Sequence, residues 1–316
     1  MEFKHTPVLL APTVDGLNIR PDGVYVDCTA GGGGHSFAIA QRLSEKGRLI
    51  ALDRDPDAIT AAGARLAEFP NAAVIHRNYS EIDSVLDELG IGGVDGILMD
   101  LGVSSHQLDE ESRGFSYHSD APLDMRMSQS GMSAADLVNS FDEQQLAKII
   151  FEYGEEKFSR RIASNIVRAR ESAPIETTRQ LADIVRDSVP QKARRDKNPC
   201  KKTFQAIRIA VNCEFDHLSE GLDKAFACLN PKGRLAVITF HSLEDRLVKQ
   251  RFAGWCRGCI CPPDFPQCVC GRKPQGTLVN RKPIEADEIE LGENPRSRSA
   301  KLRIIEKAER SADVNG

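Results

Sequence analysis

The sequence predicts an α/β fold in which a mostly parallel sheet, with helices on both faces, is interrupted by an all-helical domain. Two observations support this fold class. Between residues 24 and 102, short β-branched runs alternate with segments of helical periodicity, which is the pattern of parallel strands joined by helical crossovers. Between residues 134 and 229 only helical patterns occur, and a strand-like run then resumes at residue 233.

The first predicted strand, residues 24–29, leads into the glycine-rich turn around which the fold is organised. Four consecutive glycines, Gly31–Gly34, separate this strand from a predicted helix over residues 35–45. Glycine accepts positive φ angles and allows a ligand to approach the main chain closely. The N-terminus of the following helix adds a partial positive charge that suits a carboxylate or a phosphate. The segment therefore predicts a ligand-binding turn.

The second predicted strand, residues 48–53, ends in Asp53, about twenty residues after the glycines, where folds of this kind bind ribose hydroxyls. Residues 27–33 read D-x-T-x-G-x-G, which is similar to the D-x-G-x-G-x-G motif of class I S-adenosylmethionine (SAM) methyltransferases, with Thr29 at the first glycine. The dinucleotide motif G-x-G-x-x-G fits less well, because Ser36 occupies its last position. SAM is the predicted cofactor, and a nicotinamide dinucleotide is the alternative.

Two further strands are predicted over residues 72–77 and 94–100. Because the carboxyl ends of parallel strands meet at one edge of a sheet, we expect the polar residues that end or follow these strands to gather there: Asp27, Asp53, Asn78, Tyr79 and Asp100. Tyr79 fits two interpretations equally: an aromatic ring against adenine, or a half-buried aromatic residue at the start of a helix.

After Asp100 the alternation of strands and helices stops. Residues 110–130 are irregular and polar, and an unstructured loop of this length is usually functional or a lid. The helical patterns that follow predict an inserted helical substrate-recognition domain over residues 110–215. The predicted core then consists of residues 1–109 and residues 216–316.

Basic residues gather in two places. Six of the eleven residues from 192 to 202 are Lys or Arg, which fits either a solvated charged face or binding to a phosphate backbone. A second basic loop covers residues 294–301. The candidate RNA-binding residues are Lys192, Arg194, Arg195, Lys197, Lys201, Lys202, Arg296 and Arg298.

The sheet resumes at residues 233–240, and His241 and Ser242 should then lie at the same edge as Asp100. His241 could act as a proton donor or base, or it could cap the following helix. Ser242 is the predicted N-cap of that helix, with Asp245 three residues further on. Two late strand-like runs, residues 277–280 and 300–306, are predicted to pair antiparallel at the sheet edge.

A Cys-rich loop covers residues 256–270. Cys259, Cys261, Cys268 and Cys270 could bind a metal as pairs of thiolates. Their spacings differ from the usual C-x₂-C pairs, however, and the loop contains no histidine. The favoured interpretation is a reduced loop without a metal, and a zinc site is the alternative.

Composition limits the class of protein. The chain has 316 residues, of which 41% are hydrophobic, enough for a full core and two domains. Its net charge of −4 predicts that any nucleic-acid-binding surface is local. No apolar run approaches a membrane span and the N-terminus lacks the pattern of a signal peptide. We therefore expect a cytoplasmic protein without a membrane partner, whose nine cysteines stay reduced.

Taken together, these motifs closely resemble those of the RsmH (also called MraW) methyltransferases, and the resemblance covers nearly the whole chain. The segments that carry it are His5–Leu10, Gly32–Ser36, Leu52–Pro56, Asp100–Ser105, Arg113–Tyr117, Leu123–Met127, Tyr153–Glu156, Phe204–Asn212, Ile238–Arg246 and Asn294–Ser299. The resemblance implies a Rossmann-like class I SAM-methyltransferase fold. The family's SAM contacts correspond here to Gly33, Gly34, His35, Asp53, Tyr79, Asp100 and Gln107.

The same resemblance implies methylation of the exocyclic N4 amine of a cytosine in the decoding centre of 16S ribosomal RNA (rRNA), within the small ribosomal subunit. Asp100 is the first candidate for a catalytic contact with that amine, and His241 and Ser242 are the second candidates. Two alternatives belong to other classes. An NAD-dependent oxidoreductase would need a hydride-transfer site that the sequence does not display. A non-catalytic RNA-binding assembly factor would bind no SAM.

Overall fold

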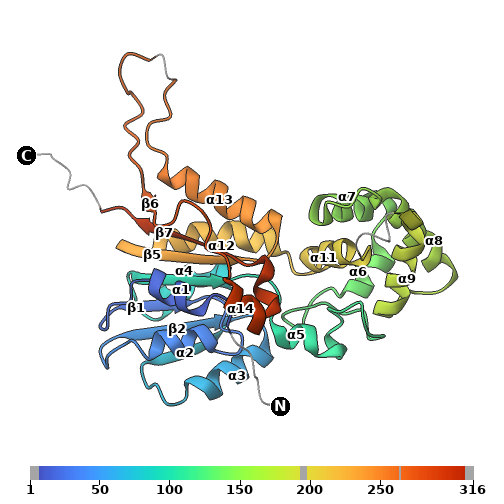
Figure 1. Ribbon diagram of the computed structural model, residues 1–316, viewed down its shortest axis with the longest axis horizontal. Coiled ribbons are helices and arrows are strands. Elements are labelled where there is room, and N and C mark those ends of the chain that lie inside the picture. The colour runs from blue at the N-terminus through green and yellow to red at the C-terminus, as the bar shows by residue number, and fades with distance from the viewer. Residues whose placement is uncertain (1–6, 193–197, 263–264, 310–316) are drawn as a thin grey trace, which may run out of the picture. The chain divides into compact units, whose positions relative to one another are not determined.

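The computed structural model describes residues 7–192, 198–262 and 265–309 (Figure 1). The chain divides into two compact units: unit 1 comprises Met1–Gly102 and His217–Gly316, and unit 2 comprises Val103–Asp216. Unit 2 begins at Val103, whereas the predicted insertion begins at residue 110. Each hydrophobic cluster of buried side chains falls within one unit. Among the described residues, no helix combines the length and the apolar character needed to cross a membrane.

Unit 1 is built on a seven-stranded sheet with the order β3-β2-β1-β4-β5-β7-β6. The strands are β1 (Val24–Asp27), β2 (Arg48–Asp53), β3 (Ala72–His76), β4 (Val94–Asp100), β5 (Leu229–Thr239), β6 (Gly276–Leu278) and β7 (Lys301–Lys307). Strands β1 to β5 pair in parallel, and β7 pairs antiparallel with both β5 and β6. The prediction of a mostly parallel sheet that ends in an antiparallel pair is confirmed.

Helices cover both faces of this sheet, as the alternation of side chains along each strand requires. Tyr25 and Val26, neighbours in β1, belong to two different apolar clusters, and so do Leu49 and Ile50 in β2. One cluster includes α4 (Ile82–Glu88), α12 (Glu214–Cys228) and α13 (Ser242–Cys256). The other includes α1 (Leu10–Gly16), α2 (Gly34–Ala40) and α3 (Pro56–Leu66). The remaining short helices of unit 1 are η1 (Tyr79–Glu81), α14 (Glu288–Glu293) and η3 (Pro295–Ser299).

Unit 2 is helical around its own apolar cluster, which includes Leu146, Ile162 and Leu181. Its elements are α5 (Ser105–Asp109), η2 (Glu111–Arg113), α6 (Ala134–Ser140), α7 (Glu143–Gly154), α8 (Ser159–Ser172), α9 (Thr178–Ser188) and α11 (Cys200–Val211). Capping boxes at Ser133, Asp142 and Thr177 begin three of these helices.

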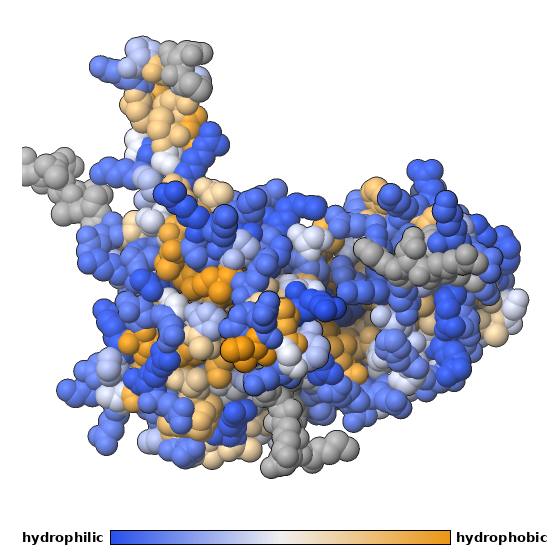
Figure 2. Space-filling view, viewed as in Figure 1, coloured by the Kyte–Doolittle hydropathy of each residue, from blue (hydrophilic) through white to orange (hydrophobic). Residues whose placement is uncertain are grey.

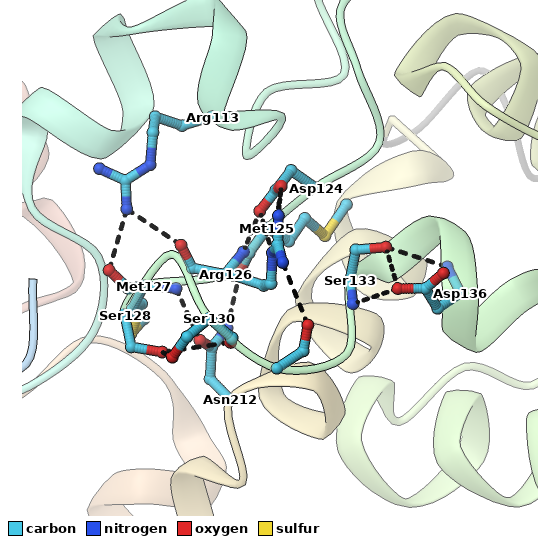
Figure 3. A network of polar contacts seen from close by, with 11 residues as sticks. Arg113, Asp124, Met125, Arg126, Met127, Ser128, Ser130, Ser133, Asp136 and Asn212 are labelled. Carbon is cyan, nitrogen blue, oxygen red and sulfur yellow. Dashed lines mark hydrogen bonds and ion pairs between the residues drawn. The ribbon is translucent and has the colours of Figure 1, made fainter.

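The sequence pattern predicts one helix over residues 203–230, and this prediction is wrong. The chain leaves the helix at Asn212, and Cys213 adopts a φ of +48°. The Asn212 side chain accepts a hydrogen bond from the Met127 N–H at 2.8 Å and donates one to the Met125 carbonyl at 2.7 Å (Figure 3). These long-range bonds favour the break, while the apolar spacing of α11 and α12 continues across it.

The same contacts order the irregular segment that precedes the helices of unit 2. The Arg113 guanidinium donates to the carbonyls of Arg126 and Met127 at 2.9 and 3.0 Å (Figure 3). Arg126 in turn pairs with Asp124, at 2.6 Å between Nη2 and Oδ2. Residues 113–127 are therefore held by polar contacts within unit 2 although they form little regular structure.

Candidate active site

The glycine turn connects β1 to α2 and depends on glycine for two different reasons. Gly31 and Gly33 have φ angles of +51° and +75°, which residues with a Cβ rarely adopt. Gly34 is needed for close approach, because a Cβ there would lie 2.2 Å from Cγ of Pro7. Three of the four glycines are thus demanded by the geometry of the turn.

Asp27, at the end of β1, supports this turn from beneath. Its carboxylate is fully buried, accepts a hydrogen bond from the Ser36 hydroxyl at 2.6 Å and accepts one from the Thr29 N–H at 3.1 Å. Burial raises the pKa of Asp27, and these hydrogen bonds oppose the rise. Asp27 therefore has a structural role in positioning the glycines.

Asp53, at the end of β2, lies directly against the turn. Its Oδ2 accepts the Gly31 N–H at 2.9 Å and its Oδ1 accepts the Asp55 N–H at 2.9 Å. Burial is the main cause that raises the pKa of Asp53 to about 6. Each oxygen keeps a further lone pair, so the carboxylate can still accept bonds from two adjacent hydroxyl groups. This donor and acceptor pattern fits a ribose.

Asp100, at the end of β4, presents an acceptor that the protein does not satisfy. Its Oδ1 is buried and has no hydrogen-bond partner among the described residues, and its Oδ2 lies 3.7 Å from Nδ1 of His35. Burial raises the pKa of Asp100 well above its ordinary value, and the charges of Asp27 and Glu244 raise it further. A buried acceptor without a partner is costly, which indicates that a ligand normally supplies the donor.

Two other predicted cofactor contacts, His35 and Tyr79, also belong to unit 1. The Nε2 atom of His35, in the first turn of α2, lies 3.1 Å from the Val8 carbonyl, which orients the ring. Tyr79 begins η1, and its ring packs against Gly221 of α12. A Cβ added at Gly221 would lie 2.6 Å from Cδ2 of the Tyr79 ring. One side of Tyr79 thus serves packing, as one of its two predicted interpretations stated.

Gln107, the remaining predicted cofactor contact, belongs to unit 2 and takes part in the cap of α5. Its N–H donates to the Ser104 hydroxyl at 3.2 Å, and its Oε1 accepts the Ser104 N–H at 3.0 Å. The residue is buried. The predicted SAM contacts therefore come from both units, with Gln107 as the member from unit 2.

His241 is the N-cap of α13, so the prediction of Ser242 as the cap is wrong by one residue. Nδ1 of His241 accepts a hydrogen bond from the Glu244 N–H at 3.3 Å. The Glu244 carboxylate in turn accepts one from the Phe240 N–H at 2.9 Å. The same carboxylate lies 3.0 Å from Nε2 of His241. An imidazole nitrogen replaces the hydroxyl oxygen that usually accepts at this position. Asp245 instead pairs with Arg303 at 2.7 Å. The role of Glu244 is absent from the predictions made from the sequence, although its place three residues after the cap is a signal for it.

The described basic candidates are exposed. Lys192, Lys201 and Lys202 lie in unit 2, where Lys202 donates to the Glu155 carbonyl at 2.7 Å. Arg296 and Arg298 are exposed on η3 in unit 1. The other three candidates, Arg194, Arg195 and Lys197, lie outside the described residues.

Sheet order and site chemistry together define the class of protein. Strand β7, antiparallel between β5 and β6, closes a sheet whose first two parallel strands carry, at their carboxyl edge, a glycine turn and an acid, Asp53, that holds this turn. This is a class I methyltransferase that uses S-adenosylmethionine.

Comparison with known proteins agrees with this class. The model of the MraW methylase family matches residues 2–308. Two relatives are named ribosomal RNA small subunit methyltransferase H. The protein from Clostridium botulinum (strain Kyoto / Type A2) is 56% identical, and the alignment covers 97% of this chain and 100% of the relative. The protein from Symbiobacterium thermophilum is 55% identical, and the alignment covers 97% of this chain and 98% of the relative. A solved rRNA methylase from Streptococcus thermophilus aligns with a TM-score of 0.43 and 12% identity over 98% of this chain and 100% of its own.

The chain belongs to the MraW methylase family. The resemblance stated from the sequence motifs is thereby confirmed, and so is SAM as the cofactor of this methylase family. The alternative of a nicotinamide-dependent oxidoreductase is set aside by the same assignment.

Proposed function

We propose that this protein transfers the methyl group of SAM to the exocyclic N4 amine of a cytosine in the decoding centre of 16S rRNA, within the small ribosomal subunit in the cytoplasm. The observation that carries the proposal is the buried Oδ1 of Asp100, an acceptor without a partner among the described residues at the end of β4. The relatives named as small-subunit rRNA methyltransferases, at 55–56% identity, support the choice of substrate.

SAM, when bound, supplies a methyl group activated by a positively charged sulfur. In this proposal Gly33, Gly34 and His35 hold its methionine end, and Asp53 accepts hydrogen bonds from its ribose hydroxyls. The exposed side of Tyr79 contacts the adenine, and Gln107 remains the contact that the family resemblance implies from unit 2. The carboxylate of Asp53 suits this role because the turn already holds it in one orientation through Gly31.

The amine of cytosine is a weak nucleophile, because its lone pair is conjugated with the ring. Its nitrogen must be held about 3–3.5 Å from the methyl carbon and in line with the bond that breaks. An acceptor for an amine N–H lets the nitrogen become more nucleophilic as the new bond forms. Asp100 is the proposed acceptor, and its raised pKa makes it a stronger base than an ordinary carboxylate. His241 and Ser242 are second candidates, with the His241 ring held by Glu244.

The cytosine must be unstacked, or already unpaired, for its amine to reach this position. We propose that the basic residues hold the surrounding phosphates: Lys192, Arg194, Arg195, Lys197, Lys201, Lys202, Arg296 and Arg298. Binding through phosphates makes RNA affinity fall steeply as salt is raised.

The proposal is tested with SAM carrying a labelled methyl group and small ribosomal subunits from cells that lack the enzyme. Nuclease digestion and mass spectrometry should place the label in N4-methylcytidine at a single site. The Asp100→Asn variant, which keeps the shape but weakens the acceptor, should lose at least about a hundredfold in turnover. Label in another nucleoside would refute the cytosine N4 assignment, and tight SAM binding without label in any ribosomal particle would refute rRNA as the substrate.

A further inference from the structure

Four cysteines converge in the loop that joins α13 to β6. This loop projects away from the sheet (Figure 1). Its base is tied by a hydrogen bond from the Gln275 N–H to the Trp255 carbonyl at 2.8 Å. The described residues between Arg257 and Gln275 form neither helix nor strand, so backbone pairing does not explain the fold of the loop.

The described residues of the loop also form no buried apolar core of their own. Ile260 and Phe265 are each 51% exposed, and Val269 is 73% exposed. Figure 2 shows apolar atoms on the surface of this projection. A segment of this length loses conformational entropy when it is ordered, and these side chains bury too little area to offset that loss. A cross-link of some kind is therefore needed.

The sulfur atoms lie close enough together to surround one tetrahedral metal ion. The Sγ atoms of Cys259, Cys261, Cys268 and Cys270 all lie within 4.8 Å of one another. Sγ of Cys270 is 3.6 Å from that of Cys268 and 3.7 Å from that of Cys259. Four thiolates at about 2.3 Å from Zn²⁺ have edges of about 3.8 Å, which these separations approach. All four cysteines are free thiols, and a disulfide would need a separation of about 2.05 Å.

Main-chain N–H groups point at two of these sulfurs. The Cys261 N–H donates to Sγ of Cys259 at 3.4 Å, and the N–H groups of Ile260 and Arg272 donate to Sγ of Cys270. Such hydrogen bonds fix the orientation of the sulfur atoms, as the outer-shell contacts of a metal site do. Basic side chains on Arg257, Arg272 and Lys273 adjoin the four cysteines in sequence and would offset the surplus negative charge of a tetrathiolate site.

We propose that Cys259, Cys261, Cys268 and Cys270 bind one Zn²⁺ and that this ion holds the projecting loop together. Each thiol releases its proton to solvent as its sulfur binds the ion. Four protein ligands leave no open position for substrate or water, so the site is structural and takes no part in methyl transfer. The unusual spacings of these cysteines, which counted against zinc in the sequence, do not keep the four sulfur atoms apart in the folded loop.

Metal content of the full chain tests the proposal. Protein expressed with zinc in the medium, and purified without chelators or metal-affinity resin, should contain about one Zn²⁺ per chain by mass spectrometry of the elements. The double variant Cys259→Ser, Cys268→Ser should retain on the order of a tenth of that or less. The matched control is Cys213→Ser, an exposed cysteine in unit 2 outside the loop, which should keep the full amount. SAM affinity, measured in the same samples, verifies that each variant is folded.

A second measurement needs no variant. Removal of zinc from the wild-type chain by a strong chelator should accelerate trypsin cleavage after Arg257 and Arg272 by about tenfold or more, and added Zn²⁺ should restore protection. Chains without zinc whose four thiols all react with an alkylating reagent would overturn the proposal, and so would two disulfides in place of the metal. Neither result depends on the identity of the methyl acceptor.

Discussion

Asp53 is held on both sides of its carboxylate, by the N–H groups of Gly31 and Asp55. Asp53→Asn keeps the size of the side chain but replaces one acceptor oxygen by a donor, so it should weaken SAM binding at least about tenfold in calorimetry. The control is Glu68→Gln, an exposed acid beyond the end of α3, which should leave the affinity unchanged. Equal affinity in the Asp53 variant and the wild type would remove this residue from the ribose site.

The raised pKa of Asp53 predicts the direction in which the free energy of unfolding changes with pH. The folded pKa is raised from 3.8 to about 6, so the folded state binds the proton more tightly than the unfolded state. This contribution to the free energy of unfolding is complete below the unfolded pKa and is lost as pH rises through about 6. Between about pH 4 and about pH 7, wild type should therefore lose on the order of 1 to 3 kcal/mol relative to Asp53→Asn in chemical denaturation. A gain in wild-type stability over that window would contradict the assignment.

His241 combines a cap with a possible chemical role, and two substitutions separate them. Asn is a good N-cap, so His241→Asn should retain stability, whereas His241→Ala should lose about 0.5–2 kcal/mol. If the imidazole acts on the substrate, both variants should lower turnover more than RNA affinity. Full turnover in His241→Asn would leave His241 as a helix cap alone.

At the scale of elements, α12 packs through a glycine against Tyr79, which is a proposed cofactor contact. A Cβ at Gly221 would lie 2.6 Å from the Tyr79 ring, so Gly221→Ala should displace the ring and weaken SAM binding about threefold to thirtyfold. Gly63→Ala in α3 is the matched control. No atom lies within 4 Å of its Cβ, so it should add about 0.5–1 kcal/mol of stability and leave SAM affinity unchanged. Unchanged affinity in both variants would show that Tyr79 does not contact the cofactor.

The elements also show how far sequence reasoning reaches. Strands 48–53 and 94–100 are predicted to the residue, because β-branched runs bounded by polar residues are local signals. The shared position of the acids at the ends of these strands, on one edge of the sheet, follows from the parallel topology. The helix break at Asn212 depends on partners distant in sequence. The cap at His241 is one of the two interpretations of that residue, and the sequence could not choose it because an imidazole is an unusual acceptor there. Asp27 illustrates the same limit, because only its contact with Ser36 distinguishes a buried support from a ligand contact.

At the scale of the whole molecule, unit 2 has its own apolar cluster and a continuous sequence, Val103–Asp216. A fragment of residues 103–216 should therefore be helical by circular dichroism and should unfold cooperatively on heating. The comparison is a fragment of unit 1, residues 1–102. This fragment lacks β5 and β7, so it should show no cooperative unfolding transition on heating. The absence of a transition in the first fragment would mean that unit 2 depends on the rest of the chain.

The place of β7 in the sheet has a consequence for synthesis. Strand β7 lies between β5 and β6, so unit 1 cannot complete its sheet until residues 301–307 have left the ribosome. Unit 2 is formed by one continuous sequence segment, so it can fold earlier during translation. Until β5 is synthesised, the edge of β4 that pairs with it stays without a neighbouring strand. During translation the incomplete sheet is therefore the species most exposed to aggregation, and chaperones that bind nascent chains should engage unit 1 longer than unit 2.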